Sequence, residues 1–107
     1  PQGLHLVEVK GVTLEDGGHA LFPDAPTERG VRHLRELASA VALGHRATVF
    51  FVIQMAEVTD FAPNDATHPA FGEALRQAVA AGVQAAAYTC RVAPDSIVID
   101  RPVPVIL

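Results

Sequence analysis

Glu8 and Lys10 are separated by one residue, Val9, in a segment rich in apolar and β-branched residues. Because successive side chains of a β-strand point to opposite faces, this spacing directs the carboxylate and the ammonium group to the same face. A carboxylate is a hard oxygen ligand for Mg²⁺ or Mn²⁺, and a neighbouring lysine can orient water or stabilise charge on a phosphoryl group. The same pattern is common as a solvated ion pair, so the spacing alone leaves both interpretations open.

A second set of polar side chains lies near the expected start of a helix. Thr27 is a suitable N-cap, and Arg29, Arg32 and His33 follow at spacings of three and four, which groups them near the helix N-terminus. The free N–H groups and positive dipole end of a helix suit phosphate, so these three residues are candidates for binding DNA or phosphate. The alternative is a solvated helix face on which Asp24 and Thr27 serve only as caps.

The remaining reactive side chains indicate no further site. The histidines outside this helix are scattered without cysteine or histidine partners at ligand spacing, so a zinc site is not expected. Cys90 is expected to be a buried structural thiol. The pair Gly17-Gly18 lacks the spacing of a P-loop or of a dinucleotide-binding loop.

Composition limits the classes of protein to consider. The chain has 107 residues with 8 basic and 12 acidic side chains, a net charge of −4, which excludes a uniformly basic nucleic-acid binder but allows a local basic patch. The longest apolar run, Val49 to Ile53, is far shorter than the roughly 20 residues of a membrane helix. A single cysteine favours a reducing compartment, and no signal peptide is evident. We therefore expect a cytoplasmic protein without membrane contact.

The apolar pattern predicts one mixed α/β domain, a central sheet with two helices. A strand is expected over 4–14, with Leu6, Glu8, Lys10 and Val12 on one face, followed by a short return strand over 19–22. One helix should run from the Thr27 cap to Gly44, and the next strand, over 46–54, should be covered on both faces. We expect an irregular loop over 55–68, a helix over 69–81 and strands over 83–92 and from residue 97, the last at a sheet edge.

Several segments, in order along the whole chain, resemble the sugar fermentation stimulation protein (SfsA) family. They are VEVKGVTL at 7–14, FPDAPTERG at 22–30, His33-Leu34, Gly44–Ala47, Ala81–Val83 and Pro102–Val105. The resemblance implies a restriction-endonuclease-like, PD-(D/E)xK core, with residues 1–107 forming a single nuclease-type domain. It also implies that the N-terminal part of the fold, an OB-type domain and the first metal-binding aspartate lie outside this chain.

The resemblance also assigns roles to residues. It implies that Lys10 and Glu8 are catalytic, and that Glu8 and the backbone carbonyl of Val9 bind Mg²⁺ or Mn²⁺. Asp24 and Thr27, together with Arg29 and His33, would line the same cleft. The implied partner is DNA, and the implied function is a DNA-binding protein linked to regulation of sugar (maltose) metabolism, with a metal-dependent phosphodiesterase site. Two alternatives stay open, namely a non-catalytic DNA-binding regulator that keeps the nuclease fold and a protein-interaction domain.

Overall fold

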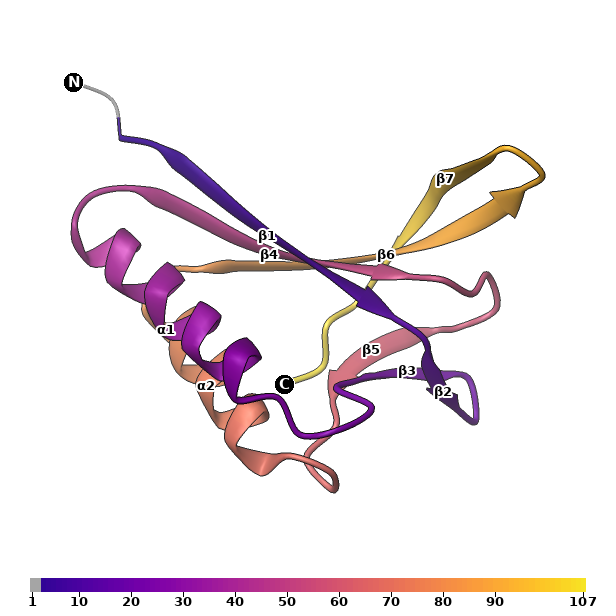
Figure 1. Cartoon of the computed structure of the whole chain (residues 1–107), viewed down its shortest axis with the longest axis horizontal. Helices are drawn as coiled ribbons and strands as arrows, with labels where there is room; N and C mark the ends of the chain where they lie inside the picture. Colours follow the sequence, from indigo (N-terminus) through magenta and orange to yellow (C-terminus); the bar gives the residue numbers. More distant parts are fainter. Residues whose placement is uncertain (1–2) are drawn as a thin grey trace.

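The chain folds into two sheets and two helices, as shown by a computed structural model that describes residues 3–107 (Figure 1). The elements in chain order are β1 (His5–Val12), β2 (Leu14–Asp16), β3 (His19–Phe22), α1 (Glu28–Ala42), β4 (Arg46–Ile53), β5 (Asp60–Pro63), α2 (Pro69–Ala80), β6 (Gln84–Ala93) and β7 (Ser96–Val103). The predicted mixed α/β class is confirmed, and so are both helices and the short return strand.

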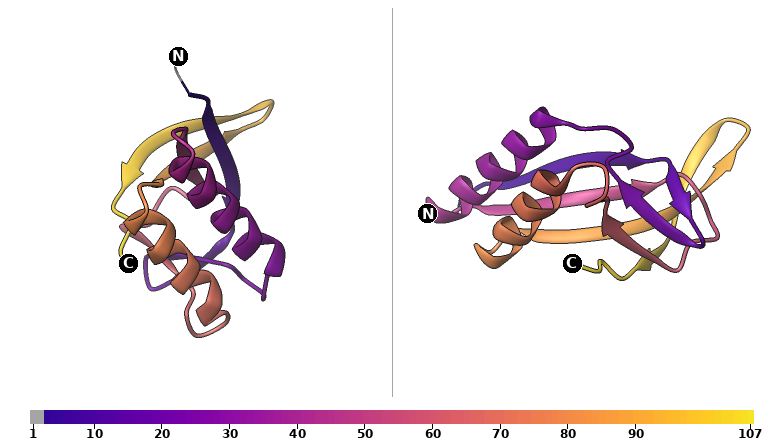
Figure 2. Two further views of the ribbon diagram at one scale, coloured as in Figure 1. Left: turned by 90° about the vertical axis from the view of Figure 1, so that its left-hand side faces the viewer. Right: turned by 90° about the horizontal axis from the view of Figure 1, so that it is seen from below.

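The larger sheet has the strand order β1-β4-β6-β7. β1, β4 and β6 are parallel, and β7 is antiparallel to β6. Both helices lie side by side on one face of this sheet, where they connect its parallel strands (Figures 1 and 2). The smaller sheet, of order β2-β3-β5, lies beyond the C-terminal ends of β1 and β4. β7 occupies an edge of the larger sheet, as Pro102 within it and Pro104 just after it predict.

Three details differ from the sequence-based expectations. The strand expected over 4–14 is divided at Thr13, because β1 pairs with β4 whereas β2 pairs with β3 in the smaller sheet. The loop expected over 55–68 contains β5, which forms because β3 offers a parallel partner. β4 is covered by helices on one face only, and on its other face Phe50 and Val52 are half-buried.

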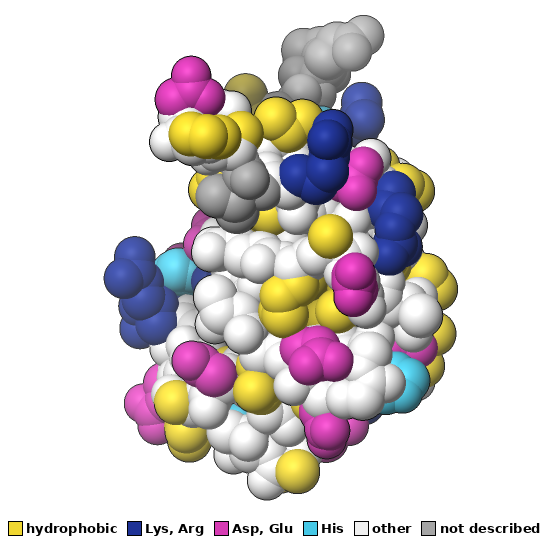
Figure 3. All heavy atoms as spheres, turned by 90° about the vertical axis from the view of Figure 1, so that its right-hand side faces the viewer, with side chains coloured by type: hydrophobic (Ala, Val, Ile, Leu, Met, Phe, Trp, Pro, Cys, Tyr) yellow, Lys and Arg dark blue, Asp and Glu magenta, His cyan; other side chains and the backbone are white. Residues whose placement is uncertain are grey.

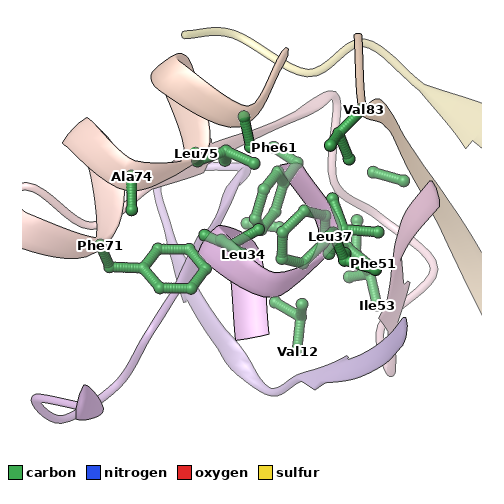
Figure 4. Packing of buried hydrophobic residues seen from close by; sticks show 14 of the residues in the cluster. Val12, Leu34, Leu37, Phe51, Ile53, Phe61, Phe71, Ala74, Leu75 and Val83 are labelled. Carbon is green, nitrogen blue, oxygen red and sulfur yellow. The ribbon is translucent and has the colours of Figure 1, made fainter. Parts of the chain in front are cut away.

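Aromatic side chains join the two sheets to α2 in the core. Phe51 of β4 stacks on Phe61 of β5 with ring centroids 4.2 Å apart, and Phe22 of β3 meets Phe71 of α2 edge-on at 5.1 Å. Phe51, Phe61 and Phe71 are fully buried. Figure 4 shows them packed with aliphatic side chains from α1, α2 and the larger sheet. The core therefore fixes α1 above β1 and β4, which is where the candidate site lies.

The sequence signals at the helix ends act as expected. The Thr27 side chain accepts a hydrogen bond of 3.0 Å from the Gly30 N–H, and the chain leaves α1 through Gly44 at a φ of +96°. Gly30 also allows the close packing of α1 on α2, because a Cβ there would lie 3.2 Å from the Phe71 ring. Cys90 is buried, and its thiol donates to the Ile53 carbonyl at 3.0 Å, as expected of a structural cysteine.

β3 and β5 are linked by a side-chain pair at the surface. His19 Nδ1 lies 2.7 Å from Asp60 Oδ1, and this hydrogen bond, followed by the charge of Asp60, raises the pKa of His19 above its ordinary value. A raised folded-state pKa means that the pair stabilises the fold at low pH, and that this contribution is lost as pH rises through that pKa. In a proton NMR titration, we expect His19 to titrate at higher pH in the parent than in an Asp60→Asn variant. Equal midpoints would contradict the pairing.

Within residues 3–107, neither helix has the length and apolar character needed to cross a bilayer.

Candidate active site

Glu8, Lys10 and His33 form a compact polar cluster between β1 and α1. Lys10 Nζ lies 3.4 Å from Glu8 Oε1, and His33 Nδ1 lies 2.9 Å from the same oxygen and 3.0 Å from Lys10 Nζ. The side chains of Lys10 and His33 are only 12% and 19% exposed, whereas Glu8 is 34% exposed. The carboxylate is therefore the member of the cluster that is most accessible to a small ion.

The register of the sheet explains why two charged groups occupy this position. In the parallel pairing of β1 with β4, Glu8 lies beside Val49 and Lys10 beside Phe51. Both β4 residues are fully buried under the helices, so the Glu8–Lys10 pair projects from an otherwise apolar face. The predicted shared orientation of Glu8 and Lys10 is consistent with their 3.4 Å contact, and α1 covers them through His33.

The backbone carbonyl of Val9 points to the open edge of the larger sheet. At one end of the β1–β4 ladder, the Leu4 carbonyl accepts a hydrogen bond from the Arg46 N–H of β4. At the other end, the Val12 carbonyl accepts one from the N–H of Gln54, the residue after β4. In a parallel ladder alternate residues bond to the same neighbour, so even-numbered residues of β1 bond to β4 and Val9 faces away. No strand of the described part of the chain lies on that side of β1. The Val9 oxygen is thus directed to the edge that lies beside the Glu8–Lys10 pair.

The oxygen atoms of Glu8 and Val9 suit a hard divalent cation, because Mg²⁺, Mn²⁺ and Ca²⁺ prefer carboxylate and carbonyl ligands. These two groups would fill only part of a coordination shell. Residues 3–107 contain no group of three or more histidine, cysteine, aspartate or glutamate side chains arranged to hold a metal ion. The donor set therefore fits a cation that also retains water or takes ligands from substrate.

The structure separates the three residues expected to bind phosphate. Arg29 Nε donates to His33 Nε2 at 3.4 Å, so these two residues belong to the cluster over β1. Arg32 directly precedes His33 in α1 but lines a different surface, a shallow groove between α1 and α2 that also contains Arg35 and His68. The resemblance implied that His33 lies in the same cleft as Glu8, whereas sequence spacing alone did not, because the contact depends on how α1 packs on β1.

The other two residues expected to line the cleft have different surroundings. Asp24 is exposed in the segment between β3 and α1. Thr27 caps α1 with its hydroxyl, and its backbone N–H donates to His68 Nδ1 at 3.1 Å. His68 therefore links the start of α1 to the start of α2, a structural role that its isolated position in the sequence did not indicate.

Charge is mixed on the face of the molecule drawn in Figure 3. Acidic side chains are spread over its lower half, and lysine and arginine side chains lie above them and at the rim. The described residues form no continuous basic surface on this face that would follow a nucleic-acid backbone.

Comparison with known sequences and structures identifies the family. Residues 2–96 match the family described as the "Sugar fermentation stimulation protein RE domain". The chain belongs to this family. A homologue from Desulfitobacterium hafniense strain Y51 is 63% identical over 92 residues, which are 86% of this chain and 40% of that protein. One from Clostridium perfringens is 48% identical over 106 residues, covering 99% of this chain and 46% of that protein.

A solved structure confirms the fold. The SfsA protein of Pyrococcus furiosus, described as a complex with Ca²⁺, matches this chain with a TM-score of 0.89 and 31% sequence identity. The match covers 96% of this chain and 45% of the Pyrococcus chain. The expected PD-(D/E)xK-like, mixed α/β fold is thereby confirmed. This chain spans less than half the length of these SfsA relatives.

Proposed function

We propose that this SfsA-family domain carries a divalent-cation-dependent site that hydrolyses phosphodiester bonds in DNA, within a protein that contributes to the regulation of sugar (maltose) metabolism. The observation that carries the proposal is the Glu8–Lys10 pair, with 3.4 Å between Oε1 and Nζ, beside the outward carbonyl of Val9. The description of the matched region as an RE domain and the Ca²⁺ complex of the Pyrococcus relative support the same function.

Each group has a distinct task in this proposal. Glu8 and the Val9 carbonyl would hold Mg²⁺ or Mn²⁺, and a bound cation of this kind supplies Lewis-acid polarisation of a phosphoryl oxygen. Lys10 places a positive charge next to that position, where it orients the attacking water and stabilises the negative charge that develops on phosphate. Its limited exposure strengthens this electrostatic effect, because few water molecules screen the ammonium group.

Glu8→Gln is expected to abolish metal-dependent nicking of supercoiled DNA, because the amide keeps the size of the side chain but loses the charge that attracts the cation. The assay compares parent and variant in Mg²⁺ and in Mn²⁺, with EDTA as the blank. Glu73→Gln, which alters an exposed glutamate on α2, is the matched control and should cleave as the parent does. Equal cleavage by the Glu8 variant and the parent would remove Glu8 from the site.

The second candidate function is a DNA-binding regulator that keeps the nuclease fold without cleaving. The observation that favours it is that Arg29 and Arg32 are both exposed near the start of α1, where they are accessible to phosphate groups. In this case the arginines near the start of α1 would act through phosphate contacts, and the domain would bind DNA without nicking it.

Arg29→Ala and Arg32→Ala are expected to weaken DNA binding if α1 faces the nucleic acid. Each lost phosphate contact should lower the slope of log affinity against log salt by about 1. Fluorescence anisotropy of labelled duplex DNA at several salt concentrations measures both quantities. Arg91→Ala, on β6, is the control for a general loss of positive charge. If all three variants bind with the parent's salt slope, the N-terminal part of α1 is not the DNA-binding surface.

A further inference from the structure

The larger sheet has an open face, on which no helix of residues 3–107 lies, because α1 and α2 both cover its other face (Figure 2). In the registers of β1 with β4 and of β4 with β6, Val9, Phe50 and Ala86 are neighbours and project to the same side. The open face thus consists of the odd-numbered residues of β1 and the even-numbered residues of β4 and of β6 as far as Tyr88. Val7 and Val9 are 54% and 60% exposed there, so this surface is accessible and largely apolar.

Two aromatic side chains occupy the middle of the open face. Phe50 and Tyr88 come from β4 and β6, the two central strands of the larger sheet. Their rings stack with centroids 5.1 Å apart and planes only 14° from parallel, and both side chains are partly exposed. Such a pair offers a π surface on which a further flat ring can stack. Aromatic side chains on an open sheet bind unpaired nucleobases in this way.

Polar and basic side chains border the aromatic pair. His5 Nε2 lies 2.9 Å from Thr48 Oγ1, and Thr48 Oγ1 donates to Gln84 Oε1 at 3.3 Å, so a hydrogen-bonded row crosses β1, β4 and β6. Arg46 is exposed at the end of this row, where it pairs with His5 in the β1–β4 register. None of the residues that make up the open face is acidic. The charge of this surface therefore suits phosphate, and the row offers hydrogen-bonding groups to base edges.

We infer that the open face is a platform for the unpaired bases of a DNA strand, on which Phe50 and Tyr88 stack with the bases and Arg46 contacts phosphate. The choice of DNA as the ligand rests on the proposed function. The platform adjoins the proposed cation site, because Val9 contributes its side chain to the open face while its carbonyl is directed to the edge of β1 beside Glu8. A strand that lies on the platform and leaves it across β1 brings its phosphates to that edge.

The composition of the chain provides a direct probe of stacking, because Tyr88 is its single tyrosine and it has no tryptophan. The intrinsic fluorescence of Tyr88 is recorded during titration with an oligothymidylate of about ten nucleotides. EDTA is present, so that no metal-dependent cleavage takes place. We expect the oligonucleotide to quench the emission, because a stacked base contacts the ring. An abasic oligonucleotide of the same length, which keeps the phosphates and lacks the bases, should leave it nearly unchanged. Equal quenching by both oligonucleotides, or by neither, would overturn the inference.

Substitutions separate stacking from a general loss of apolar surface. Phe50→Leu and Tyr88→Leu are expected to weaken the binding of labelled oligothymidylate by about 5–100-fold, measured by fluorescence anisotropy of the label. Tyr88→Phe keeps the ring and should bind as the parent does. Leu43→Ala, which alters an exposed apolar side chain at the end of α1, is the matched control and should also bind normally. If the leucine variants bind as tightly as Tyr88→Phe, the two rings form no platform.

A second copy of the chain is the competing occupant of the open face. Sedimentation velocity of the free protein over a range of concentrations distinguishes the two, and we expect a monomer. A dimer that Phe50→Leu dissociates would overturn the inference.

The platform and the proposed function can fail separately. If oligothymidylate quenches Tyr88 but the parent nicks no DNA in Mg²⁺ or Mn²⁺, hydrolysis fails as a proposal and the platform stands. If the parent nicks DNA and oligothymidylate leaves the Tyr88 emission unchanged, the platform fails and the proposed function stands.

Discussion

Lys10→Met is expected to lower the rate of metal-dependent DNA nicking by about 10²–10³-fold, the usual effect of removing one preorganised group that stabilises transition-state charge. Methionine preserves most of the length and apolar stem of this nearly buried side chain, so the variant removes mainly the charge. The first-order rate of conversion of supercoiled plasmid to the open circular form in Mn²⁺ measures the effect. The circular dichroism spectrum of the variant shows whether the fold is retained.

Two further variants separate the role of Lys10 from a general effect of charge. Arg91→Met removes an exposed positive charge from β6 and should leave the nicking rate close to the parent's. Lys10→Arg keeps the charge, but its planar guanidinium differs in shape from an ammonium group, so an intermediate rate is expected. If Lys10→Met nicks DNA as fast as the parent does, the lysine has no part in the reaction.

Local sequence patterns were sufficient to predict the features of the fold that depend only on neighbouring residues. The alternation along β1 predicted that Glu8 and Lys10 share a face, and Thr27 and Gly44 marked the two ends of α1. Each of these features depends on a few neighbouring residues, because strand alternation, helix capping and a positive φ at glycine are local properties.

Features that depend on distant partners could not be predicted in the same way. β5 has four residues, one of them proline, and it forms a strand because β3 lies beside it. The contact of His33 with Glu8 joins residues on two elements, whose approach is determined by the packing of α1 on the larger sheet. In the sequence, His33 was grouped with Arg29 and Arg32 by spacing, but adjacent residues of a helix differ by a rotation of about 100°, which is enough to direct Arg32 to another surface.

Phe51→Ala is expected to lower the free energy of unfolding by about 3–5 kcal/mol, the cost of leaving a phenylalanine-sized cavity in a core. Phe51 is fully buried and contacts the rings of Phe61, Phe22 and Phe71, which come from β5, β3 and α2. Its removal therefore weakens the packing between the two sheets and α2. Urea unfolding followed by circular dichroism measures the loss, and the milder Phe51→Leu keeps the comparison possible if the alanine variant does not fold.

Phe50→Ala is the matched control, because it changes the same residue type one position earlier on the opposite face of β4. Phe50 is half-buried and stacks on Tyr88 with centroids 5.1 Å apart. With part of the ring already in water, its removal should cost only about 1–2 kcal/mol. A loss as large as that of Phe51→Ala would mean that the open face of the larger sheet is covered in solution. A small loss would show that the core beneath the helices alone carries the stability that positions Glu8, Lys10 and His33.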